Sequence, residues 1–304
     1  MNLSAHSHDR RAEFLLLGLV FVWAANFPVM KFALIGIPLL VFNSIRFVVG
    51  ASVLGAAFAS RSKWVPFERT ELWKVVGIGL LAHFVYQMVF IVGLTLTTAG
   101  NSAVLVSTAP LWTVFFDSRL HKTPISRHMW IGMGVSFAGV ILIVIGSGKK
   151  LEFGSAALVG DIITLAAASL WGLYTNLQKH LLARHSAVQL TFSMVTMGAI
   201  GLTLIGIPSI ASVNWGSIPW PYYLAAIASG ALSIGFANAV WSYGVKRLGP
   251  GRTSAFNNLV PVLAFIISYL ALDEKIYAIQ VVGAAITISG VWLARKRVSQ
   301  EVQP

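Results

Sequence analysis

The chain consists of long apolar runs joined by short polar connections. Ten runs are long enough to cross the hydrocarbon core of a bilayer, which takes roughly 20 residues in a helix. Lipid offers the backbone no hydrogen bonds, and the runs do not alternate in polarity as barrel strands do, so each is predicted to be a helix. The runs cover about 14–35, 39–59, 72–94, 101–118, 128–147, 158–180, 188–210, 221–244, 253–272 and 276–294.

Composition supports this interpretation. Of the 304 residues, 57% are hydrophobic and 11% are charged, whereas an ordinary soluble domain has about 25% charged residues. This excludes a soluble globular protein and predicts an all-α polytopic membrane protein. The chain has no cysteine, and its histidines follow no metal-ligand spacing, so neither a metal site nor a cofactor is expected.

The positive charge follows the connections between the runs. The chain has 22 Lys and Arg against 10 Asp and Glu, a formal net charge of +12. If the N-terminus is cytoplasmic, 17 of the 22 basic residues fall on the cytoplasmic side, which agrees with the positive-inside rule. Ten spans then place both tails, 1–13 and 295–304, in the cytoplasm. The charge is explained by topology and by anionic lipid, so no nucleic-acid partner is expected.

An internal repeat divides the chain into halves at 14–147 and 158–294. Five glycines and a mid-helix proline recur at an offset of 151, and a Trp and a Lys recur at 148. Five spans per half make the second half enter the membrane from the opposite face, so the halves are predicted to be inverted. The matches are Trp23/Trp171, Lys31/Lys179, Gly79/Gly230, Gly93/Gly244, Gly100/Gly251, Pro110/Pro261, Gly132/Gly283 and Gly139/Gly290.

This pattern resembles the drug/metabolite transporter superfamily, and more narrowly its EamA-type ten-helix members. The resemblance rests on the first-helix Trp, the fourth-helix Pro, and the pairs Ile131-Gly132 and Gly139-Val140, which recur as Val282-Gly283 and Gly290-Val291. Asp273 and Glu274 look like the acidic hinge of that family. The resemblance implies a small-molecule exporter of the bacterial inner membrane. Amino acids, including aromatic ones as in the YddG-like branch, are its expected cargo.

Polar and aromatic residues at membrane depth are the candidates for substrate binding, because each costs free energy unless it faces a cavity or a partner. In inverted repeats such a cavity lies at the interface of the halves, near the midplane. The predicted lining is Trp23, Asn26, His83, Tyr86, Gln87, Trp171, Tyr174, Gln178, Asn238, Trp241, Asn257 and Asn258. A structural interpretation stays open for each of them: a packed histidine, interfacial aromatics, or amides that only join helices.

Two cations and two prolines complete the predicted site. Arg46 lies about seven residues into its span and could bind a substrate carboxylate, reach toward the membrane interface or pair with a backbone carbonyl. Lys31 could line an outer vestibule or extend its ammonium to the membrane surface. Pro110 and Pro261 each remove a backbone donor in mid-span and are predicted to act as kinks or hinges.

None of the ten acids lies in the middle of a span, which disfavours proton-coupled cation antiport through a membrane glutamate. The sequence therefore predicts alternating-access export of small metabolites, amino acids first, without catalytic residues. A monomer is compatible with this architecture. The alternatives are export of other metabolites or drugs and, from other classes, an integral-membrane enzyme or a channel. No catalytic motif supports an enzyme, and the inverted repeat favours a transporter over a channel.

Overall fold

The computed structural model describes residues 10–61, 64–121, 127–146, 156–272 and 276–295, and in these ranges every regular element is helical. The α-helices are α1 (Arg10–Gly36), α2 (Leu39–Arg61), α3 (Arg69–Leu80), α4 (Tyr86–Leu96), α5 (Ala99–Val106), α6 (Ala109–His121), α7 (Arg127–Gly146), α8 (Ala156–Leu177), α9 (Lys179–Arg184), α10 (Ala187–Ser212), α11 (Trp220–Ala228), α12 (Asn238–Ala255), α13 (Val260–Leu272) and α14 (Ala278–Arg295).

Seven continuous segments of the described chain are long and apolar enough to cross a membrane. They match seven of the predicted spans: Arg10–Gly36, Leu39–Ser60, Arg69–Leu96, Ala99–Leu120, Ala156–Arg184, Ala187–Ser212 and Trp220–Ser254. The fifth and tenth predicted spans contain the shorter apolar helices Trp130–Ile143 and Ala278–Gly290. The structure thus shows a polytopic helical membrane protein.

The ninth predicted span, 253–272, is not one helix. A 3₁₀ segment, η4 (Phe256–Leu259), separates α12 from α13. Within α12, Gly249 adopts φ +81° and ψ 164°, which breaks the helix between the eighth and ninth predicted spans. Only glycine adopts this backbone conformation without a steric penalty, and the next residue, Pro250, suits the first position of a new helical piece.

Two π-helical segments interrupt the third and eighth predicted spans. They are η1 (Leu81–Val85), between α3 and α4, and η3 (Ser229–Ala237), between α11 and α12. Shifting η1 by the repeat offset of 151 places it inside η3. Each segment ends one or two residues before an amide that the sequence analysis selected: η1 ends two residues before Gln87, and η3 ends directly before Asn238. Segments of this kind occur frequently at functional sites.

The fourth predicted span is interrupted directly before Pro110. Helix α5 ends at Val106 and α6 begins at Ala109. The hydroxyls of the two intervening residues donate to the preceding turn, Ser107 to the Val104 carbonyl at 2.6 Å and Thr108 to the Leu105 carbonyl at 2.7 Å. Carbonyls in this irregular turn are thus satisfied inside the protein, as an apolar medium requires.

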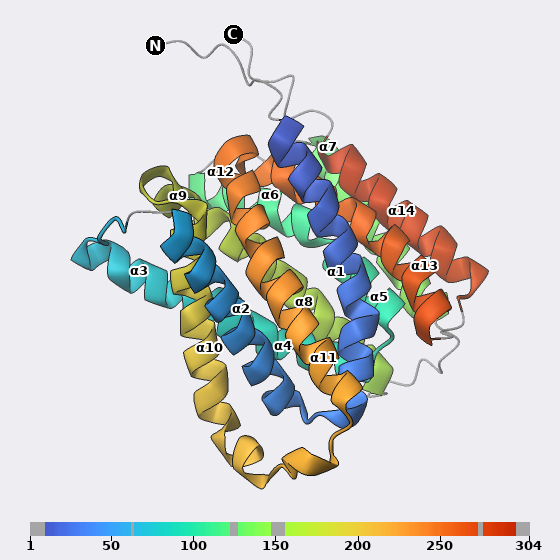
Figure 1. Ribbon diagram of the computed structural model, residues 1–304. Coiled ribbons are helices and arrows are strands. Elements are labelled where there is room, and N and C mark those ends of the chain that lie inside the picture. Colours follow the sequence, from blue (N-terminus) through green and yellow to red (C-terminus); the bar gives the residue numbers. More distant parts are fainter. Residues whose placement is uncertain (1–9, 62–63, 122–126, 147–155, 273–275, 296–304) are drawn as a thin grey trace, which may run out of the picture.

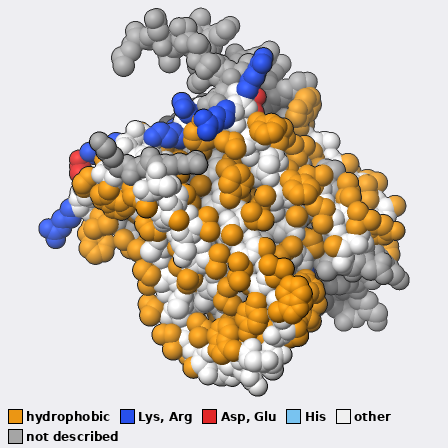
Figure 2. Space-filling model, in the orientation of Figure 1, with side chains coloured by type: hydrophobic (Ala, Val, Ile, Leu, Met, Phe, Trp, Pro, Cys, Tyr) orange, Lys and Arg blue, Asp and Glu red, His pale blue; other side chains and the backbone are white. Residues whose placement is uncertain are grey.

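The helices lie side by side, and α1 begins at the same end of the bundle at which α14 ends (Figure 1). On the visible face, Lys and Arg gather toward that end, while apolar side chains cover most of the remaining surface (Figure 2). Large apolar residues on the outside include Phe14, 77% exposed, and Leu270, 76% exposed. Such a surface suits contact with lipid chains and would be a liability in water.

Helices α7 and α14 cross through glycines. A β-carbon built on Gly290 would lie 2.6 Å from the Gly132 carbonyl, and one built on Gly139 would lie 2.6 Å from the Gly283 carbonyl. Since Gly290 is the repeat equivalent of Gly139, and Gly283 of Gly132, each contact is the counterpart of the other. This reciprocity is the pattern of a two-fold interface, and close backbone approach is typical of packing in membranes.

We expect Gly290→Ala to destabilise the protein by about 1 to 3 kcal/mol, because the new methyl group has no space at this crossing. Its β-carbon would lie 2.3 Å from the Ser136 backbone nitrogen. The matched control is Gly134→Ala on α7, where the built β-carbon meets nothing within 4 Å. Thermal unfolding in detergent should show a lower midpoint for the first variant only. Equal midpoints would contradict the close crossing.

A polar network joins the start of α3 to the connection between α9 and α10. Arg184 donates to Glu68 at 2.7 Å and to Glu71 at 3.0 Å, and the buried His185 places Nε2 3.2 Å from Glu71. The guanidinium of Arg184 lowers the pKa of the exposed Glu68 carboxyl, chiefly through this hydrogen bond. The ring of Phe67 packs 4.3 Å from that of His185. The network fixes the connections at the basic end.

Glu71→Gln should destabilise this network by about 1 to 3 kcal/mol, because it weakens two charge-assisted contacts of a buried carboxylate. Glu68→Gln, the same change at an exposed carboxylate, should have a smaller effect, because an exposed ion pair contributes little to stability. Thermal unfolding at neutral pH, where both carboxylates are charged, compares the two. A larger loss for Glu68→Gln would be the opposite of this expectation.

Candidate functional site

A cavity lies in the middle of the bundle and encloses about 670 Å³ of space not filled by atoms, including solvent-open space. Its lining comes from α1, α2, η1, α4, α5, α8, η3, α12, η4 and α13. The lining residues are Trp23, Asn26, Phe27, Met30, Arg46, Phe47, His83, Tyr86, Gln87, Phe90, Ala103, Val106, Ser107, Trp171, Ser233, Ile234, Asn238, Asn257 and Val260.

Aromatic rings form one wall of the cavity. The ring of Trp171 lies 5.4 Å from that of Trp23 and 5.1 Å from that of Tyr86, measured between centroids. Phe90 continues this wall, stacked on Tyr86 at 5.7 Å and edge-on to Phe27 at 5.8 Å. These rings offer a ligand a large apolar surface, and their faces attract a cationic group.

Arg46 is the permanent charge of the cavity. Its side chain is only 1% exposed, its Nη1 donates to Asn43 Oδ1 at 3.2 Å, and its guanidinium lies 5.1 Å from the centre of the Phe42 ring. Gln87 donates to the same Asn43 oxygen at 3.3 Å. In the described parts of the chain, no carboxylate forms an ion pair with Arg46. A buried charge without a counter-ion is costly, so Arg46 favours an anion in the cavity.

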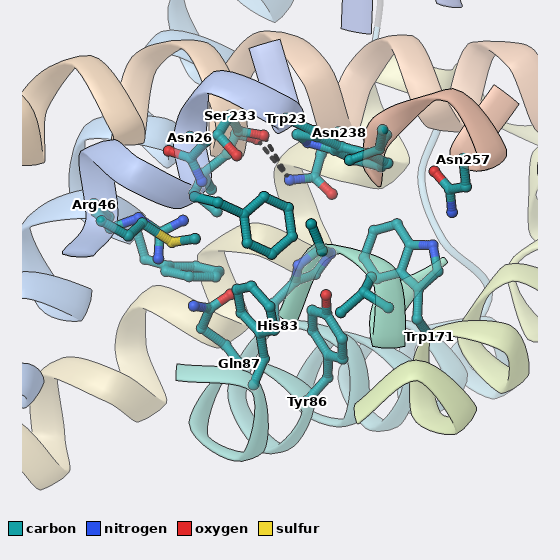
Figure 3. Close-up of a pocket in the computed structure, with 18 of the residues that line it drawn as sticks. Trp23, Asn26, Arg46, His83, Tyr86, Gln87, Trp171, Ser233, Asn238 and Asn257 are labelled. Carbon is teal, nitrogen blue, oxygen red and sulfur yellow. Dashed lines mark hydrogen bonds between the residues drawn. The ribbon is translucent and has the colours of Figure 1, made fainter. Parts of the chain in front are cut away.

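Amide oxygens are available elsewhere in the lining. Asn238 uses its NH₂ group to donate to the Ser233 and Ile234 carbonyls at 3.1 and 3.2 Å, which turns its Oδ1 away from them. This Oδ1 and that of Asn257 are buried and accept no hydrogen bond from the described residues. Figure 3 shows Arg46 at one end of the cavity and Asn257 at the other, with Asn238 and Trp171 toward the Asn257 end.

His83 lies on η1 in the wall between these ends. It is 2% exposed, its Nε2 has no hydrogen-bond partner in the described structure, and its ring lies 5.4 Å from that of Tyr174. Its ring also lies 6.1 Å from that of Phe47. The residue is therefore packed among aromatics and faces the cavity at the same time.

Four predicted site residues are not part of the lining. Tyr174 and Trp241 are fully buried behind it, with the Trp241 ring 5.5 Å from that of Trp171. Gln178 accepts from Ser242 at 3.0 Å in a buried polar chain, and Lys31 donates to the Thr97 carbonyl. Helical spacing placed these residues on helix faces near the cavity. It did not show which side chains line the cavity and which pack behind the lining.

The remaining predicted residues are the two kink prolines and Asn258, which was predicted to line the cavity. Pro110 follows the interruption between α5 and α6 and is not in the lining, although the neighbouring Ser107 is. Pro261 lies in α13, directly after η4, and Asn258 lies within η4. The side chains of these last two lie outside the described part of the structure.

The sequence analysis missed Asn43, the shared acceptor that holds Arg46 and Gln87. It is fully buried on α2. Its spacing of three residues from Arg46 was an available signal, because residues at i and i+3 share a helix face. Ser233 was also missed, since η3 turns it toward the cavity and π-helical geometry leaves no mark in an apolar sequence.

Part of the lining consists of equivalent positions in the two halves of the sequence. Trp23 and Trp171 correspond at an offset of 148, and all other pairs at 151. Both members of each pair line the cavity. The pairs are Trp23/Trp171, His83/Ile234, Gln87/Asn238 and Val106/Asn257.

No group of three or more His, Cys, Asp or Glu residues in the described structure could hold a metal ion. Among the described residues, the lining contains no Asp or Glu. Apolar spanning helices around a central cavity are the architecture of membrane transport proteins.

Comparison with known proteins identifies the family. A sequence model of the EamA-like transporter family matches residues 10–145 and 158–295. The chain therefore belongs to the EamA-like transporter family, within the drug/metabolite transporter superfamily, as its sequence pattern predicted.

Relatives and a solved structure agree with this assignment. An uncharacterized transporter of Archaeoglobus fulgidus is 27% identical over 96% of this chain and 100% of its own. A probable terminal-alkyne amino-acid exporter of Streptantibioticus cattleyicolor is 27% identical over 94% of both chains. A probable amino-acid metabolite efflux pump of Escherichia coli is 25% identical over 94% and 95%. A crystal structure with 20% identity has the same fold, with a TM-score of 0.70 over 93% of this chain and 98% of that one.

Proposed function

We propose that this transporter exports small metabolites, amino acids first and aromatic ones among them, through the central cavity by alternating access. One observation carries the proposal: a buried cation, Arg46, and free amide oxygens, on Asn238 and Asn257, lie around an aromatic-walled cavity. A zwitterion with an apolar side chain complements all three features. The names of two relatives, an amino-acid exporter and an amino-acid metabolite efflux pump, support this cargo.

The proposal includes ten spans, arranged as inverted halves 14–147 and 158–294 with both termini cytoplasmic. Equivalent contacts between the halves support it. A β-carbon on Gly79 would lie 3.0 Å from Met194 Cα, and one on Gly230 would lie 3.0 Å from Arg46 Cα. Met194 is the 148-offset equivalent of Arg46, so these contacts are counterparts, as are those between α7 and α14. Two halves related in this way can close the cavity from either side by equivalent motions.

The location proposed is the bacterial inner membrane. Two of the three relatives described above come from bacteria. The basic end of the bundle, toward which Lys and Arg gather in Figure 2, suits a cytoplasmic surface.

An amino-acid flux assay in proteoliposomes tests the cargo. We expect saturable counterflow with one or more of the common amino acids. Trp171→Ala and Gln87→Ala should each lower it by about tenfold, through loss of the aromatic wall and of a cavity hydrogen bond. Trp220→Ala, at a side chain that is 72% exposed, is the matched control and should retain the flux. If no amino acid moves, the cargo assignment fails. Flux without counterflow would indicate a channel.

The described lining contains no Asp or Glu, which leads to a prediction about coupling. Net downhill flux should not require a pH difference, because the described lining residues offer no carboxylate to exchange a proton for cargo. The measurement is the initial rate with and without an imposed pH gradient. Strict dependence on the gradient would overturn this expectation and would direct attention to His83.

A further inference from the structure

We propose that the cavity binds its cargo in one orientation and selects for the carboxylate rather than for the ammonium, so that aromatic 2-hydroxy acids are also cargo. This inference rests on the proposed function and deepens it. It follows from a difference between the two ends of the cavity, in their charge and in the hydrogen-bonding groups that they present.

The Arg46 end is built to receive an anion. Asn43 Oδ1 accepts from both Arg46 and Gln87, at 3.2 and 3.3 Å, and so holds the two donors side by side. Arg46 Nε remains buried without a partner. A guanidinium with unused donors and no counter-ion in the described structure matches a carboxylate, which accepts two parallel hydrogen bonds.

The repeat equivalent of this end carries no charge. The position that corresponds to Arg46 at the 148 offset is Met194, which is fully buried. A symmetric cavity would accept a cargo in two orientations, but this cavity has its cation in one half only. The carboxylate of the cargo is therefore fixed at the α2 and α4 side.

The opposite end presents neutral groups only. The Asn238 amide is oriented by its two bonds to η3 carbonyls, so its free Oδ1 is an acceptor. Asn257 Oδ1 is likewise free, and Trp171 offers a ring face nearby. Since the lining residues that the structure describes include no Asp or Glu, an ammonium finds hydrogen-bond acceptors and an aromatic face there but no opposite charge. A hydroxyl group donates to the same oxygens.

The carboxylate and the ammonium of the cargo should therefore contribute unequally to binding. Loss of the carboxylate removes a charge-assisted interaction and leaves Arg46 unpaired, which should lower binding by about 10- to 100-fold. Replacing the ammonium by a hydroxyl exchanges one donor to a neutral oxygen for another and should change binding by less than about tenfold.

Four aromatic probes test this in proteoliposomes, with protein-free liposomes as the blank for passive leakage: L-phenylalanine, L-3-phenyllactate, 2-phenylethylamine and L-phenylalaninamide. Protein-dependent flux is expected for the first two and should be at least about tenfold lower for the last two. Ligand-induced thermal stabilisation in detergent gives the same comparison without transport.

Two variants connect the selectivity to the Arg46 end. Arg46→Met installs the residue of the other half, and Asn43→Asp is an isosteric change that places a carboxylate beside the guanidinium as an internal counter-ion. Both should abolish the preference for phenylalanine and phenyllactate over the two probes that lack a carboxylate. Lys179→Gln, which removes an exposed cation from α9, is the control and should keep the preference. If Arg46→Met does not fold, the near-isosteric Asn43→Asp still decides.

The outcomes separate this inference from the proposed function. Flux of phenylalanine together with phenylethylamine or the amide, at similar rates, would overturn the inference and leave amino-acid transport standing. Flux of phenylalanine without phenyllactate would also overturn it, as would an unchanged preference in Asn43→Asp. Absence of flux and of stabilisation with all four probes, while other amino acids move, would overturn the inference alone. Absence with every amino acid would overturn both.

Discussion

The hydrocarbon core of a membrane offers the peptide backbone no hydrogen-bond partners, and the architecture of the protein depends on this constraint. It makes the spans helical and confines irregular backbone to places where protein groups can satisfy it. The irregular segments η1, η3, η4 and the Ser107–Thr108 turn all contribute to the cavity lining or directly adjoin it. These four interruptions of regular helix thus form part of the site.

The interruptions also supply the polar chemistry of the cavity. Asn238 bonds to the Ser233 and Ile234 carbonyls that the π-helical segment presents, and the same bonds determine which amide atom remains for a ligand. Asn43 acts similarly on Arg46 and Gln87. In both places the hydrogen bonds of a buried amide orient a polar group toward the cavity. At Asn238 this group is its own Oδ1, and at Asn43 it is the side chains of Arg46 and Gln87.

Much of this architecture could be predicted from the sequence, because burial in lipid demands long apolar runs and their boundaries are visible. The candidate site could be predicted in part. Nine of the predicted polar or aromatic residues line the cavity, since membrane depth and helical spacing restrict where such side chains can point. Tyr174, Gln178 and Trp241 lie one layer behind, because spacing gives a helix face but not its distance from the cavity. The role of Asn43 and the position of the π-helical segments depend on contacts between helices. The spacing of residues within one helix carries no information about such contacts.

The crossing of α7 and α14 has a mechanical consequence. At Gly290 and Gly139 the facing helix approaches with its backbone, which excludes a β-carbon at either position. A backbone contact cannot absorb a displacement by rearranging side chains, so sliding one helix along the other would bring peptide groups into collision. The two contacts, Gly132 with Gly290 and Gly139 with Gly283, are seven residues apart on each helix, so a rotation about one of them would disturb the other. The two helices are therefore held in one register and are expected to move as a unit.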